Sequence, residues 1–211
     1  MGNIDKLIEK LAQDGTAVKP AHHPVLLCLE WMAAAVFYLA VALMLTGFRS
    51  DLTVKLHEPW FAAELAALAG IFVATSLSAA LLSFPDLHQM RRVALAPALM
   101  FALFALVMFF AWGADTPPSL PPVHSVECTL GITMLAILPA VWIFFAMRKF
   151  ASTHHYWAGG IALLAAFSIG ALWLRLYEQT DSIMHVIEWH YLPMIIIGLL
   201  GMWLGRLILK W

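Results

Sequence analysis

Three polar connections between long apolar segments are richer than the rest of the chain in side chains that could bind a metal ion. The connections hold, in chain order, His57 and Glu58; His124, Glu127 and Cys128; and Glu178, Asp181, His185, Glu188 and His190. Imidazole, thiolate and carboxylate groups together suit zinc or another borderline metal ion. The connections therefore offer ligands for a metal site, although they contain no dense ligand motif and solvated loop histidines are common.

Cys128 is the most distinctive of these ligands. It follows His124 by four positions, so both side chains share one face if a helix begins that early. The other cysteine, Cys28, lies far away in the sequence and forms no CxxC pair with it, so the chain has no disulfide framework.

Sequence signatures of enzymes and of nucleic-acid binding are both missing. The chain has no GxSxG, no HExxH and no phosphate-binding glycine loop. Its formal charge of -1 gives no basic surface for DNA or RNA. We therefore expect neither catalysis nor direct nucleic-acid contact.

The elements that would position these ligands are membrane helices. Of the 211 residues, 63% are hydrophobic and only 12% are charged, which is too few for the surface of a soluble domain. A spanning helix needs about 20 apolar residues. We predict an all-α protein with a cytoplasmic arm, residues 1–23, and a membrane domain, residues 24–211, whose six helices span about 24–47, 59–84, 93–113, 126–147, 156–176 and 191–209.

Basic residues predict the orientation of the bundle, because Lys and Arg accumulate on the cytoplasmic side. One set of flanks holds nine of the twelve: Lys6, Lys10, Lys19, Arg91, Arg92, Arg148, Lys149, Arg206 and Lys210. Both termini are therefore expected in the cytoplasm, and the three ligand-bearing connections on the outer side.

The arm carries an amphipathic helix. Its apolar residues recur at the spacing of one helical face: Ile4, Leu7, Ile8 and Leu11. The face could lie on the membrane or under the bundle, or it could dock in the groove of a partner. The sequence leaves both readings open.

Three ionisable residues fall within or at the ends of apolar segments: Glu30, Glu64 and Arg175. Such groups are costly in a membrane and are candidates for functional sites. Interfacial anchoring or one interhelical hydrogen bond is the more common explanation.

Four stretches in the same order resemble the negative regulator of sigma F (NrsF) family of bacterial membrane proteins. They are IDKLIEKLAQDGTAVKP, TGFRSDLTVKLHEPWFAAEL, ECTLGITMLAILPAVWIFFAMRK and the closing segment from LYEQTDSIMHVIEWHY to the C-terminus. The resemblance implies an anti-sigma factor that holds an extracytoplasmic-function sigma factor at the inner membrane and releases it on a stress signal. Leu7, Ile8 and Leu11, with Ile4 on the same face, would contact the sigma factor.

The chain departs from the family at one of two cysteines near the outer surface. Cys128 matches the first, but Glu178 stands at the second, so a disulfide switch between these positions is excluded. The resemblance leaves open a mixed signal-sensing site of Cys128, His124, Glu178 and His185. It implies no resident cofactor, with a metal ion as one candidate signal.

Two other functions remain open alternatives. A small transporter or channel component for a metal or organic solute would also be a bundle of apolar helices, and so would a structural subunit of a larger complex. Deletion of residues 1–15 separates the first from a regulator, because transport should survive it and sigma-factor binding should not.

Overall fold

The computed structural model describes residues 2–15, 22–114 and 125–210, all of whose regular elements are helical. Residues 16–21 of the predicted arm and His124 lie outside these ranges. The long helices are α1 (Gly2–Asp14), α2 (Pro24–Thr46), α4 (Pro59–Leu82), α5 (Ala96–Ala114), α6 (Val126–Met147), α7 (His155–Tyr177) and α9 (Leu192–Ile208).

Six helical segments are long and apolar enough to span a bilayer, which confirms the predicted fold class of an all-α bundle with a short N-terminal helix. The short helix η2 (Val93–Leu95) extends the α5 span at its start. By length and composition the chain is a multi-pass membrane protein.

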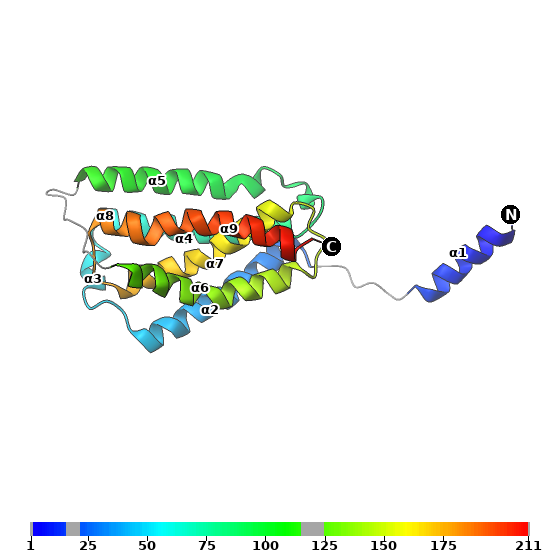
Figure 1. Ribbon diagram of the computed structural model, residues 1–211, viewed down its shortest axis with the longest axis horizontal. Coiled ribbons are helices and arrows are strands. Elements are labelled where there is room, and N and C mark those ends of the chain that lie inside the picture. The colour runs from blue at the N-terminus through cyan, green and yellow to red at the C-terminus, as the bar shows by residue number, and fades with distance from the viewer. Residues whose placement is uncertain (1, 16–21, 115–124, 211) are drawn as a thin grey trace.

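Helix α7 lies at the centre of the bundle, between α4, α6 and α9 (Figure 1). In its most apolar stretch 83% of the residues are buried inside the protein, against 17% for the span that contains α5. Large apolar side chains of α5 such as Leu99 and Phe109 are exposed. A continuous exposed apolar surface of this kind is unusual for a soluble protein and suits contact with lipid.

Glycines allow α7 and α9 to approach closely. A Cβ atom on Gly201 would lie 2.6 Å from the carbonyl oxygen of Gly159, which is too close for any side chain. Gly160 and Gly198 line the same contact. Small residues of this kind are how membrane helices gain packing contacts, since lipid leaves them little hydrophobic driving force.

A proline inside α6 leaves one backbone acceptor without its usual partner. Pro139 has no N–H, so the carbonyl of Leu135 four residues earlier receives no helical hydrogen bond. The hydroxyl of Tyr38 in α2 donates to this oxygen over 2.9 Å. The contact therefore fastens α2 to α6 at mid-helix.

The last span begins earlier than predicted. Its helical segment starts at Ile183, not at Tyr191, and consists of α8 (Ile183–His185), the π-helical segment η3 (Val186–Tyr191) and α9. The sequence analysis placed His185, Glu188 and His190 in a polar connection before this span. His185 and His190 are in fact buried against the bundle. The short helices α3 (Leu52–Lys55) and η1 (Leu87–Gln89) complete the fold.

Candidate metal centre

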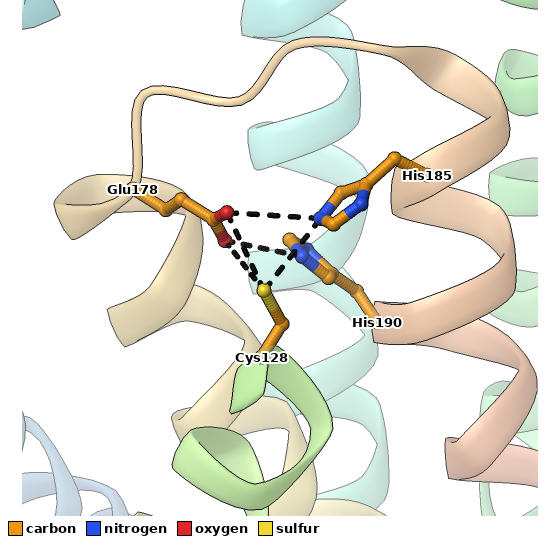
Figure 2. A group of neighbouring side chains, drawn as sticks. All are labelled: Cys128, Glu178, His185 and His190. Atoms are coloured by element: carbon orange, nitrogen blue, oxygen red, sulfur yellow. Dashed lines mark hydrogen bonds and ion pairs between the residues drawn. The ribbon is translucent and has the colours of Figure 1, made fainter. Parts of the chain in front are cut away.

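Four potential metal ligands converge where α6 begins and α7 ends (Figure 2). Cys128 lies in the first turn of α6, and Glu178 directly follows α7. His185 ends α8, and His190 lies in η3. One ligand atom from each of the four falls within 4.8 Å of every other.

The carboxylate of Glu178 contacts each of the other three groups (Figure 2). The Sγ atom of Cys128 is 3.4 Å from Oε1 and 3.3 Å from Oε2 of Glu178. Nε2 of His185 lies 3.7 Å from Oε1, and Nε2 of His190 lies 3.3 Å from Oε2. Cys128 Sγ is also 3.6 Å from His185 Nε2. The four groups thus surround one small volume.

The π-helical segment explains how two histidines five positions apart reach this volume. In an α-helix each residue turns about 100°, so residues five apart would point about 140° away from each other. The wider π turn pairs each residue with the fifth one along and so brings such residues close to one face. The rings of His185 and His190 lie 5.1 Å apart, centre to centre.

Both histidines are buried, but their ring nitrogens differ in their hydrogen bonding. Nδ1 of His185 shares a hydrogen bond of 3.0 Å with the hydroxyl of Ser125, which leaves Nε2 directed at Cys128 and Glu178. His190 is 0% exposed, and among the described residues neither of its ring nitrogens has a hydrogen-bond partner of good geometry. A buried polar group without a good hydrogen bond is costly, so its presence points to a ligand.

Electrostatics keep Glu178 ionised. Burial alone would raise the pKa of its carboxyl group, but the favourable interactions of the carboxylate with His190 and Cys128 outweigh burial and lower that pKa to about 2. An ionised carboxylate, a thiol and two imidazoles form a mixed oxygen, sulfur and nitrogen donor set. Such a set suits a borderline divalent ion such as zinc.

The structure brings together three of the four predicted sensing residues: Cys128, Glu178 and His185. The fourth, His124, lies outside the described residues. His190 takes part in the cluster although the predicted set omitted it. Its signal in the sequence was the five-residue spacing from His185, which has no meaning for an α-helix and becomes informative only in a π turn.

An ionic network borders the cluster. Arg49, which is 3% exposed, donates to both carboxylate oxygens of Asp181 over 2.9 Å and to Asp51 over 2.7 and 2.9 Å. Lys55 lies 2.9 Å from Asp181 as well. Since Asp181 and Glu178 belong to one short connection, this network holds the segment that carries the cluster carboxylate.

Glu64 and Arg175 form an ion pair inside the bundle. Nη2 of Arg175 donates to Oε2 of Glu64 over 2.8 Å, and both side chains are almost fully buried. The hydroxyl of Tyr191 donates to the same carboxylate, and Nη1 of Arg175 donates to the carbonyl of Thr180 over 3.1 Å. The pair is thus the interhelical hydrogen bond that the sequence allowed. Glu30, by contrast, is exposed and lies 3.1 Å from His22.

The predicted contact residues of the arm lie on α1 and have accessible side chains. Their exposed fractions are 67% for Ile4, 57% for Leu7, 60% for Ile8 and 63% for Leu11.

Taken together, the spans and the polar cluster at one end define a multi-pass membrane protein with a candidate ligand-binding site. Residues 11–211 match the family described as NrsF, negative regulator of sigma F, and the chain belongs to that family. No curated protein and no solved structure matches it.

The resemblance seen in the sequence is therefore confirmed. Membership implies negative regulation of a sigma factor, and the family is one of anti-sigma regulators rather than of enzymes. The match begins at Leu11, so Ile4, Leu7 and Ile8 of α1 lie before it.

Proposed function

We propose that this protein sequesters an extracytoplasmic-function sigma factor at the bacterial inner membrane and releases it on a stress signal. The match of residues 11–211 to a family of negative sigma-factor regulators carries this proposal. Six candidate spans account for membrane anchoring. Nine of the twelve basic residues belong to the segments that the sequence assigns to one side of the membrane, which supports cytoplasmic termini, where a sigma factor is found.

The contact would be made by the apolar face of α1. All four side chains of this face are more than half exposed, as a docking helix requires before its partner binds. An amphipathic helix of this kind binds by placing its apolar face in a hydrophobic groove. The polar residues on the opposite side of α1 would remain in water.

Release requires two arrangements of the protein with different affinities for the signal. A signal shifts the population only by its differential affinity for the two states. The proposed sensing site is the cluster of Cys128, Glu178, His185 and His190. Its residues come from three different segments, so a signal that binds them would depend on the relative positions of these segments.

A pull-down from the native membrane tests the proposal. Full-length protein should capture a sigma factor, and a variant with Leu7→Asp and Leu11→Asp should lose it. The matched control carries Lys6→Gln and Lys10→Gln, which change the net charge by the same amount on the opposite face of α1. The control should retain capture.

Two outcomes would count against the proposal. If full-length protein captures no sigma factor, the regulator is the wrong function and a solute transporter becomes the leading alternative. If the apolar-face variant and the control capture equally well, the contact lies elsewhere than α1.

A further inference from the structure

We infer that Cys128, Glu178, His185 and His190 form a tetrahedral binding site for a zinc-like divalent metal ion. The inference concerns this particular donor set, with one sulfur, one carboxylate and two imidazole nitrogens. Three segments of the chain supply it: the start of α6, the end of α7, and the α8–η3 segment.

The spacing of the ligand atoms is the first observation. Zinc binds nitrogen and oxygen at about 2.0–2.2 Å and sulfur at about 2.3 Å, so in a tetrahedral site neighbouring ligand atoms lie about 3.3–3.6 Å apart. The distances among Cys128 Sγ, the Glu178 oxygens and His185 Nε2 run from 3.3 to 3.7 Å. His190 Nε2 lies 3.3 Å from Glu178. All four ligand atoms lie within 4.8 Å of one another, so an ion could draw them into a tetrahedral shell by side-chain adjustment.

The unsatisfied nitrogens of His190 are the second, independent observation. The ring is completely buried, and among the residues that the structure describes it has no hydrogen-bond partner of good geometry. Nε2 has only its 3.3 Å contact with Glu178 Oε2, and a metal ion there would give this nitrogen a well-placed partner. The short distance to Glu178 Oε2 also suits two ligands of one ion.

Support from outside the ligand shell is the third observation. Metal-binding histidines commonly fix their second ring nitrogen by a hydrogen bond. His185 has this arrangement, because Ser125 holds Nδ1 and leaves Nε2 to the cluster. Asp181, three residues after Glu178, is held by Arg49 and fastens the connection that carries the carboxylate.

Metal binding would join the three segments more tightly. If the arrangement that binds metal differs from the one that holds the sigma factor, the ion shifts the population between them. This regulatory consequence rests on the proposed function, whereas metal binding itself does not.

Cobalt(II) is a suitable probe, because it replaces zinc in tetrahedral sites and absorbs visible light there. Purified full-length protein, freed of metal by a chelator and kept reduced, should bind one equivalent of cobalt(II). Visible bands of tetrahedral cobalt and a near-ultraviolet thiolate-to-cobalt band should both appear, and zinc should remove them. No saturable cobalt spectrum, or one without the thiolate band, would overturn the inference.

Ligand variants locate the site. Cys128→Ser should abolish the thiolate band, and His190→Gln should weaken cobalt binding by more than about tenfold. The controls are Cys28→Ser, at the other cysteine, and His57→Gln, whose histidine lies in another connection. Both controls should bind as the unaltered protein does. Equal binding by the ligand variants and the controls would overturn the assignment.

A variant whose cobalt absorption should increase provides a further test, because misfolding could cause a loss of absorption but not a gain. Glu178→Cys places a second thiolate in the same shell, so the thiolate-to-cobalt absorption per bound ion should roughly double. An unchanged intensity would show that position 178 is not a ligand.

The regulatory consequence is measured separately, by adding zinc to membranes that hold the captured sigma factor. A change in retained sigma factor that Cys128→Ser removes would support it, and retention that zinc does not alter would overturn it. Since the cobalt spectra need no sigma factor, failure of the metal site can be told apart from failure of the proposed function.

Discussion

Asp181 accepts hydrogen bonds from two nitrogens of Arg49, a residue 132 positions earlier in the chain. Arg49 follows α2, and Asp181 lies between α7 and α8, so the pair ties two distant connections together at the same end of the bundle. Glu178 lies in the second of these connections. The position of the proposed metal ligand therefore depends on an ion pair outside the ligand shell.

Replacement of Asp181 should destabilise the protein and remove part of the pH dependence of its unfolding free energy. Asp181→Asn weakens a charged hydrogen-bond network, which we expect to cost about 1–3 kcal/mol of unfolding free energy at neutral pH. Burial would raise the pKa of Asp181, but hydrogen bonds from Arg49 and Lys55 outweigh it, so the folded-state pKa lies below the ordinary value of 3.8.

The sign of the pH effect follows from this lowered pKa. The contribution of Asp181 is complete above pH 3.8 and is lost as the pH falls through the folded-state value. The unfolding free energies of the unaltered protein and the Asp181→Asn variant should be measured in detergent at neutral pH and again well below pH 3.8. The difference between the two should become smaller at the lower pH. A difference that stays constant would contradict the prediction.

The buried pair of Glu64 and Arg175 should be sensitive to loss of one partner. Glu64→Ala leaves a buried guanidinium group without its counter-ion, and we expect a loss of about 3–5 kcal/mol in unfolding free energy. A triple variant, Glu64→Leu with Arg175→Met and Tyr191→Phe, removes the carboxylate together with both of its hydrogen-bond donors. This variant should recover most of the lost unfolding free energy. If it is no more stable than the single variant, uncompensated charge is not the cause.

The close contact of α7 and α9 should not tolerate a side chain at Gly201. A Cβ there would lie 2.6 Å from the Gly159 carbonyl oxygen and 2.9 Å from Cβ of Leu163. Gly201→Ala should therefore destabilise the protein by about 1–3 kcal/mol. At Gly113, where a Cβ would meet nothing within 4 Å, the same change should cost nothing. Thermal unfolding of the two variants in detergent compares them directly, and equal midpoints would refute the packing argument.

Tyr38 and Pro139 should be energetically coupled. Tyr38→Phe removes the donor to the Leu135 carbonyl and should cost about 1–3 kcal/mol. In a Pro139→Ala background the restored backbone N–H can bond that carbonyl, so the loss of the hydroxyl should matter less. A double-mutant cycle on unfolding free energy measures this coupling, and additive effects would exclude it.

The sequence alone determined the number of spans and the exposed apolar face of α1. Hydrophobicity is a property of each segment, and a bilayer accepts an apolar segment of about 20 residues as a helix whatever its neighbours are. The pattern of Ile4, Leu7, Ile8 and Leu11 is likewise local, because it depends only on the helical repeat. The family resemblance rested on the order of short stretches, which is also written in the sequence.

Only the tertiary structure decided which polar groups meet. His190 belongs to the cluster because η3 is a π turn. The hydropathy pattern had instead predicted a connection at this segment. Glu64 pairs with Arg175, and Arg49 pairs with Asp181, although more than a hundred residues of chain separate the members of each pair. Such pairs depend on how helices pack, and packing follows from side-chain shape and close glycine contacts that no periodicity in one segment records.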